Sequence, residues 1–171
     1  MTDPKRLYDE DFVLWSQHQA EALRAASRDG GNGPLDWENL AEEIESLGIS
    51  QRTALRRQIR RIIRHLIKLQ CSLANDPHPG WKASIRDARG AVQDLLQDSP
   101  SLASEIPQII AQQTSRTLRE VIVDLEDYGE LAGSWLVAGK SKARQDLFRF
   151  AEDQVLGDWF PPQPQQQGGA A

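Results

Sequence analysis

Apolar side chains recur every three to four residues in each long stretch of the chain, and this spacing constrains the fold more than any other feature. The clearest case is the segment from about Ser50 to Leu73. Six aliphatic residues there fall on one face of a helix: Leu55, Ile59, Ile62, Leu66, Leu69 and Leu73. No stretch shows the polar–apolar alternation of a β-strand. The sequence therefore predicts an all-α protein, an antiparallel helical bundle of about five to seven helices with short connections.

Capping and helix-breaking residues divide the chain into segments. We expect helices over 8–26, 36–47, 50–73, 81–97 and 101–128, with two shorter ones over 131–138 and 141–156. Asp36 and Ser50 are predicted N-caps, and Gly48 is predicted to end the helix before it. The apolar stripe of that helix consists of Trp37, Leu40, Ala41, Ile44 and Leu47. The register of residues 129–149 stays open.

The composition indicates one globular domain. Hydrophobic residues make up 39% of the chain and charged residues 26%, which is enough to form a core. We expect residues 1–160 to form a single helical-bundle domain and the low-complexity tail 161–171 to be disordered. The single cysteine, Cys71, excludes an internal disulfide and a multi-cysteine zinc site. Without a long apolar run or a secretory-type leader, we expect a cytoplasmic protein with no membrane partner.

Charge is distributed unevenly along the chain, whose net charge is -5. Residues 1–49 hold 11 acidic and 4 basic residues, whereas residues 50–75 hold seven basic residues and no acidic one. A short turn at residues 48–49 would place the helices on either side of it antiparallel. We therefore expect ion pairs between acidic and basic residues of this hairpin, namely from Glu42 and Glu45 to Arg52 or Arg56.

Four cations of the basic segment share a face that points away from its apolar stripe: Arg57, Arg61, Arg64 and Lys68. They form a candidate anion-binding face. The alternatives are a solvated face, or one covered by acids of another helix such as Asp9, Glu10 and Asp11. The acidic balance of the whole chain and the lack of an aromatic stacking platform argue against nucleic acid as a partner.

Six motifs point to a known family. They are Tyr8-x-x-Asp11-Phe12-x-x-Trp15, the segment DWENLAEEIESLG from Asp36 to Gly48, His65-Leu66-x-Lys68-x-Gln70, Trp81-x-x-x-Ile85, Leu95-Leu96-x-Asp98-Ser99-Pro100-Ser101-Leu102, and Glu152 to Asp158. Together they resemble the bacterial family called domain of unknown function 29, over residues 8–128 and more loosely over 150–161. The resemblance implies an all-helical, cytoplasmic bacterial protein, and it implies no activity.

Motifs that would support catalysis are missing from the sequence. None of the three histidines has a glutamate three residues before it, as a di-iron bundle requires, and there is no Gly-x-Ser-x-Gly nucleophile elbow. The segment from Gly133 to Ser141 has five residues between its glycines where a P-loop has four. We therefore predict no catalytic residue, no metal and no cofactor.

Two hypotheses for function follow. The leading one is a non-enzymatic helical binding module that engages another protein. The alternative is a small enzyme or ligand-binding protein with an inter-helix pocket near four residues: Glu42, Glu45, His65 and Trp81. A deep pocket in which these side chains converge would favour the alternative, and an exposed apolar patch would favour the binding module. The sequence leaves the oligomeric state and the identity of any partner open.

Overall fold

The structure is a computed structural model that describes residues 4–30, 33–74, 77–130 and 148–162, and its regular elements in these ranges are all helical. In chain order they are α1 (Pro4–Glu10), α2 (Phe12–Arg28), α3 (Trp37–Cys71), α4 (His78–Asp98), the 3-10 helix η1 (Pro100–Glu105), α5 (Ile106–Asp127) and α8 (Glu152–Leu156). The prediction of an all-α protein is confirmed. Most of the predicted disordered tail lies outside the described residues.

The chain divides into two compact units. The first comprises Met1–Leu55 and Gln93–Glu105, and it therefore contains α1, α2, the first part of α3, the end of α4 and η1. The second comprises Arg56–Val92 and Ile106–Ala171, which include the rest of α3 and α4 together with α5 and α8. The prediction of a single domain over residues 1–160 stays a prediction.

Asp11 separates α1 from α2 in the first unit, so the prediction of one helix over 8–26 is wrong at this residue. The backbone of Asp11 is extended, and its side chain accepts a hydrogen bond from the amide of Leu14 at 2.9 Å, which makes it the N-cap of α2. The same buried carboxylate accepts bonds from the amide of Ser101 at 2.6 Å and from the Ser101 hydroxyl at 2.9 Å. Asp11 therefore starts α2 and ties it to η1.

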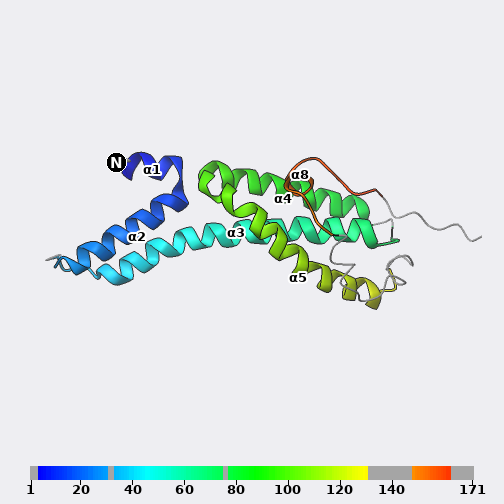
Figure 1. Cartoon of the computed structure of the whole chain (residues 1–171), viewed down its shortest axis with the longest axis horizontal. Coiled ribbons are helices and arrows are strands. Elements are labelled where there is room, and N and C mark those ends of the chain that lie inside the picture. Colours follow the sequence, from blue (N-terminus) through cyan, green and yellow to red (C-terminus); the bar gives the residue numbers. More distant parts are fainter. Residues whose placement is uncertain (1–3, 31–32, 75–76, 131–147, 163–171) are drawn as a thin grey trace, which may run out of the picture. The chain divides into compact units, whose positions relative to one another are not determined.

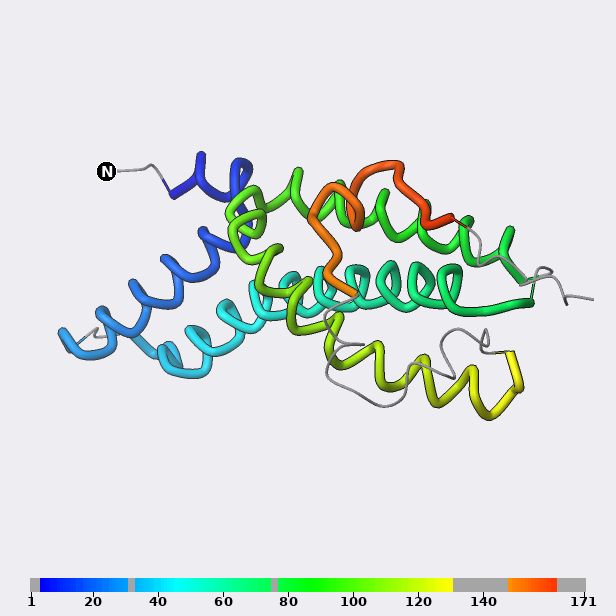
Figure 2. The backbone as a smooth tube through the Cα atoms, turned by 45° about the vertical axis from the view of Figure 1, so that its right-hand side comes forward, coloured from blue at the N-terminus to red at the C-terminus, as the bar shows by residue number. Residues whose placement is uncertain are grey.

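Helix α3 continues without interruption through Gly48, so the predicted turn at residues 48–49 is wrong. Gly48 is buried, and a β-carbon added there would clash with the hydroxyl of Ser16 in α2. Figures 1 and 2 show α2 and the first part of α3 running side by side. Gly48 thus allows two helices to approach closely and does not end a helix. Ser50 is not an N-cap, because its hydroxyl donates to the Ser46 carbonyl within α3 at 2.9 Å.

The predicted helix start at Asp36 agrees with the structure, whereas α4 begins at His78, before the predicted residue 81. A carboxylate oxygen of Asp36 accepts a hydrogen bond from the amide of Asn39 at 3.3 Å, as an N-cap does. Pro100 is the first residue of η1 and follows Ser99, whose hydroxyl oxygen accepts a bond from the amide of Val13 at 3.2 Å. The predicted helix over 101–128 begins as the 3-10 helix η1 and becomes α-helical only at Ile106.

The second unit holds most of the buried aliphatic side chains. From α3 it buries the predicted stripe residues 59, 62, 66 and 69, together with Ile63 and Ile67. Helix α4 adds Ile85, Ala88 and Val92, and the long stripe of α5 adds six aliphatic residues: Ile106, Ile109, Ile110, Leu118, Val121 and Leu125. The three helices bury these faces because each has its apolar residues at helical spacing.

Arg89 of α4 holds the last described segment in place. Its side chain is 6% exposed and donates to three main-chain carbonyls: those of Val155 at 2.8 Å, Gln154 at 2.9 Å and Trp159 at 2.8 Å. Phe160 lies against the guanidinium, with its ring centroid 5.1 Å from the central carbon. Burial lowers the pKa of Arg89. The carbonyl dipoles thus stabilise this charge where it is removed from water.

The predicted helix over 141–156 is wrong at residues 148–151, where the chain is not helical. Helix α8 begins only at Glu152, because the amide of Ala151 donates to the Gln154 side chain at 2.9 Å and this bond caps a new helix start. The rest of this prediction, and the predicted helix over 131–138, lie outside the described residues.

Candidate functional site: an apolar face on the first unit

The four residues of the predicted inter-helix pocket fall into two pairs. Glu42 and Glu45 belong to the first unit, and His65 and Trp81 belong to the second. Glu45 forms an ion pair with Arg24 of α2, with 2.6 Å between the two charged groups, and Glu42 is exposed. The pocket hypothesis stays a prediction.

The prediction of ion pairs across a hairpin, from Glu42 and Glu45 to Arg52 or Arg56, is wrong because all four residues lie on the single helix α3. Glu45 and Arg52 each bind a different element. Arg52 pairs with Glu105 at the end of η1, with 2.7 Å between the two side chains, whereas Glu45 pairs with α2. The acidic and basic segments therefore link α3 to its neighbours and do not link two arms of a hairpin.

His65 and Trp81 stack in the second unit. Their ring centroids are 6.5 Å apart, the ring planes differ by 24°, and the Lys68 ammonium lies 5.7 Å from the Trp81 ring. Burial, followed by the charge of Lys68, lowers the pKa of His65 to about 4, so the imidazole is neutral at pH 7. Its Nδ1 atom is buried and has no hydrogen-bond partner among the described residues. This contact is a packing arrangement between a neutral ring, an indole and a cation.

Acids of α5 cover part of the candidate anion-binding face. Arg64 lies 3.5 Å from Glu120 and 3.9 Å from Asp124. Arg61 donates to the Ser84 hydroxyl at 2.8 Å, Lys68 lies over Trp81, and Arg57 is exposed. Glu120 and Asp124, the acids found close to this face in the described part of the chain, both belong to α5. Anion binding at this face stays a prediction.

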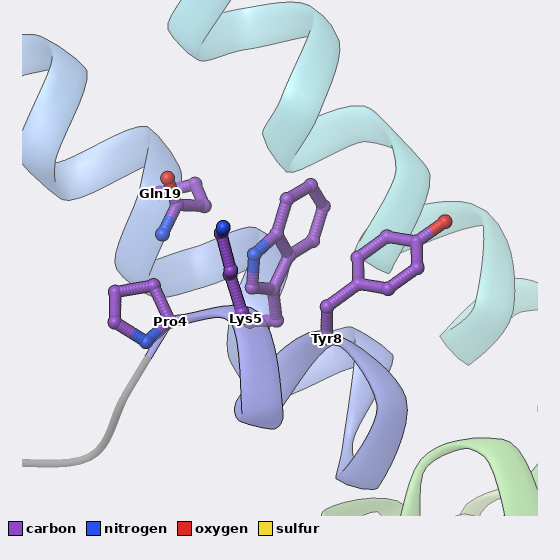
Figure 3. Close-up of a pocket in the computed structure, with 5 residues that line it drawn as sticks. Pro4, Lys5, Tyr8 and Gln19 are labelled. Carbon is purple, nitrogen blue, oxygen red and sulfur yellow. The ribbon is translucent and has the colours of Figure 1, made fainter.

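Three aromatic rings gather where α1 meets α2. The Tyr8 ring is edge-on to Phe12 and Trp15, with centroid distances of 5.7 and 4.8 Å, and Phe12 stacks on Trp15 at 5.6 Å. Tyr8 is nevertheless 50% exposed. An open pocket of about 520 Å³ is lined by two of these rings, Tyr8 and Trp15, and Figure 3 shows Lys5 and Gln19 close to each other at this pocket, with Tyr8 on the other side of Lys5.

Helix α3 adds an apolar line on the same side of the first unit. Ala41, Gly48 and Leu55 are buried, and the residues at 40, 44, 47 and 51 lie to one side of that buried line because each residue turns a helix by about 100°. Gln51 lines a second pocket of about 300 Å³ together with Tyr8 and Phe12, which shows that this side faces the aromatic rings. Leu40 and Leu47 are 38% and 46% exposed.

We call this surface the apolar face. Its members are Tyr8 of α1, Phe12, Trp15 and Gln19 of α2, and Leu40, Ile44, Leu47 and Gln51 of α3. The sequence assigned Leu40 and Leu47 to a single core stripe with Ala41. That stripe is wide because it contains two lines, one that packs against α2 and one that remains exposed. In the sequence, the width of this stripe was the signal that it contains more than one line of residues.

Carboxylates lie at one end of the apolar face. The smaller pocket is lined by Asp9 and Asp98 as well as by Tyr8, Phe12 and Gln51, and both aspartates are exposed. The whole first unit contains 14 acidic and 5 basic residues. The aromatic and aliphatic members of the face are therefore set in a strongly negative unit.

Comparison with known proteins gives the same fold. An alpha-helical protein of unknown function from Rhodospirillum rubrum, solved by crystallography, superposes with a TM-score of 0.62 and 25% sequence identity, and the match covers 90% of this chain and 98% of that one. No curated protein matches the sequence. The family model described as domain of unknown function DUF29 matches residues 7–128. This range contains the apolar face, the Asp11–Ser101 link and the His65–Trp81 stack, and the chain belongs to the DUF29 family.

Proposed function

We propose that this protein is a non-enzymatic helical module that binds another protein through the apolar face of its first unit. The observation that carries the proposal is the exposure of three large side chains on one side of that unit. Tyr8, Leu40 and Leu47 are 50%, 38% and 46% exposed, whereas Leu7 of α1 and Ala41 and Leu55 of α3 are buried. Large apolar side chains that stay exposed on one side of a globular protein are typical of an interaction site.

The distribution of buried residues supports the proposal. Among the described residues, the first unit buries six apolar side chains, and two of them are alanines: Leu7, Val13, Ala20, Ala41, Leu55 and Leu102. The second unit buries eighteen. The first unit thus has the smaller core of the two, and each Å² of apolar surface that a partner covers on it contributes roughly 25 cal/mol before the cost of association.

The chemistry of the face supports binding without catalysis. Its members are aromatic, aliphatic and amide side chains, which pack and form hydrogen bonds but do not transfer protons near neutral pH. We place this interaction in the bacterial cytoplasm. No described helix is long and apolar enough to cross a membrane, and the one cysteine of the chain is buried, which suits a compartment that does not stabilise disulfides.

Site-specific photo-crosslinking in the cells that make the protein tests this proposal. A benzophenone amino acid replaces Leu47 on the apolar face or, as the matched control, Ile49, which is 53% exposed on another side of α3. We expect a discrete adduct with a second protein from position 47 and none from position 49. Leu40→Glu should abolish the adduct, because it places a charge within the face two helical turns away. Equal crosslinking from both positions, or no adduct from position 47, would contradict the proposal.

A further inference from the structure

We propose that the partner of the apolar face is a basic amphipathic helix, with leucine-like side chains over Leu40 and Leu47 and a lysine or arginine at the Tyr8–Phe12 end of the face. This inference rests on the proposed function and specifies the chemistry of the partner. It is carried by charge complementarity and by the order of features along α3.

The charge of the first unit selects a cationic partner. With 14 acidic and 5 basic residues, this unit is far more negative than the chain as a whole. A second copy of the same unit would therefore be repelled, and so would an acidic helix, since charges within a Debye length of about 8 Å interact strongly at physiological salt. A partner that carries positive charge beside its apolar stripe is instead attracted by the acidic residues of the first unit.

The smaller pocket provides a place for one cation. Asp9 and Asp98 line this space of about 300 Å³ together with the rings of Tyr8 and Phe12. Two carboxylates supply charge, and the faces of aromatic rings attract an ammonium or guanidinium group. The volume is sufficient for one long basic side chain, whose methylene groups can pack on the rings.

The order of features along α3 defines the pattern of the partner. Leu40 and Leu47 are two helical turns apart, and Gln51, which lines the smaller pocket, follows one turn later. A helix lying along this line would present apolar residues at i and i+7, with one basic residue about one turn beyond. Apolar anchors at i and i+7 belong to the spacing by which an amphipathic helix docks in an apolar groove.

Synthetic peptides test the inference directly. The probe is a dye-labelled helical peptide of about 18 residues with leucine at i, i+3, i+4 and i+7 positions and lysine at the others. Two companion peptides replace every lysine with glutamate or with glutamine. Fluorescence anisotropy with the full-length protein at physiological salt should show saturable binding of the lysine peptide, with an affinity at least about tenfold above that of either companion.

Matched variants separate specific docking from general attraction between opposite charges. Leu47→Glu and Ile49→Glu each add one negative charge at an exposed position of α3, so attraction alone would strengthen binding of the lysine peptide to both. We expect Leu47→Glu to weaken it about tenfold or more and Ile49→Glu to leave it unchanged or slightly tighter. Leu47→Ser, which adds no charge, should also weaken it, and circular dichroism checks that each variant remains helical.

The smaller pocket has its own test. Asp98→Asn should weaken binding of the lysine peptide about threefold to tenfold and leave that of the glutamine peptide unchanged. If the glutamine or glutamate peptide binds as tightly as the lysine peptide and loses binding in Leu47→Glu, the inference about charge is wrong and the proposed function stands. If the lysine peptide binds Leu47→Glu as tightly as the unmodified protein, this docking site is overturned. Only the crosslinking experiment decides whether a protein occupies the face in cells.

Discussion

Ser16 of α2 occupies the space that a β-carbon on Gly48 of α3 would need. The Ser16 side chain is fully buried, and its hydroxyl donates to the Val13 carbonyl of its own helix at 2.8 Å, so it has little freedom to move away. Two helices of the first unit therefore pack at a point where one residue lacks a side chain and the other has a small one. The pair explains why a glycine lies in the interior of a helix of 35 residues.

Gly48→Ala is expected to destabilise the protein by about 1–3 kcal/mol, because the added methyl group overpacks the contact with Ser16. In a Ser16→Ala background the same substitution should instead be neutral or stabilising, since alanine favours a helix interior over glycine by about 1 kcal/mol. Urea unfolding of the four proteins in this cycle measures the free energy of unfolding. The control is Gly90→Ala in α4, where nothing lies within 4 Å of the added carbon and we expect a gain of about 0.5–1 kcal/mol. If Gly48→Ala and Gly90→Ala lower the free energy of unfolding by the same amount, the Ser16 contact is not the cause.

Arg89→Met should lower the free energy of unfolding by about 3 kcal/mol. The substitution removes a buried cation that donates to three carbonyls, and hydrogen bonds to charged groups are each worth about 1.5–3 kcal/mol. The α8 segment should also open more often, so hydrogen exchange at the amides of Val155 and Gly157 should accelerate about tenfold or more. Arg86→Met is the control, because Arg86 is exposed and lies over the same Phe160 ring. Equal losses in the two variants would count against the role given to Arg89.

His65 should make stability depend on pH between about 6.5 and 4. Its pKa is lowered from 6.5 to about 4, chiefly by burial and then by the charge of Lys68, so the unfolded chain binds more protons in this window. The contribution is fully present above pH 6.5 and is lost as the pH falls toward 4. The shift alone would be worth up to about 3 kcal/mol, and because the ring is only half-buried, screening by solvent leaves about 1–2 kcal/mol.

The measurement compares the free energy of unfolding of the unmodified protein and His65→Phe from pH 7 to pH 4. Phenylalanine keeps a flat ring against Trp81 and has no proton to gain. The difference between the two proteins should change across the window by about 1–2 kcal/mol in favour of the variant at low pH. Parallel pH profiles would mean that His65 does not titrate as its surroundings suggest.

The basic stripe is expected to leave the protein a weak nucleic-acid binder. Glu120 and Asp124 lie close to Arg64, Lys68 lies over an indole, and the chain as a whole is negative, so few phosphates can be neutralised. Gel-shift titrations with duplex DNA and single-stranded RNA at physiological salt should show no saturable binding at nanomolar concentration. Saturable nanomolar binding that disappears on charge reversal at Arg57, Arg61 and Arg64 would refute this expectation.

Local sequence signals were sufficient to predict those features that depend on residues close together in the chain. Asp36 was expected to cap a helix and does so, because the capping bond reaches only three residues along the chain. The apolar spacing from Leu55 onward was expected to form a buried face, and its members up to Leu69 are buried. Helical periodicity sets which residues share a face whatever the rest of the fold does.

The same signals failed where a contact distant in sequence decides the outcome. Gly48 followed by Ser50 has the pattern of a helix end and a new N-cap, and only the presence of Ser16 explains why the glycine lies within a helix instead. In the sequence, Asp11 is one of three consecutive acidic residues, Asp9, Glu10 and Asp11. Its role as a cap is strengthened by Ser101, ninety positions away, which no local pattern could indicate.

Amino-acid sequence by itself determined that this chain is all-helical, where its main apolar stripes run and which family it belongs to, because these depend on periodicity and on short motifs. Tertiary structure alone decided which residues of an apolar stripe became buried and which stayed exposed. Leu40 and Ala41 are adjacent in one predicted stripe, yet Ala41 is fully buried and Leu40 is 38% exposed. The physical reason is that a helix covers only those residues of its partner helix that directly face it. Small residues such as Ala41 and Gly48 let the partner helix approach along that line, and the larger leucines beside it remain in water.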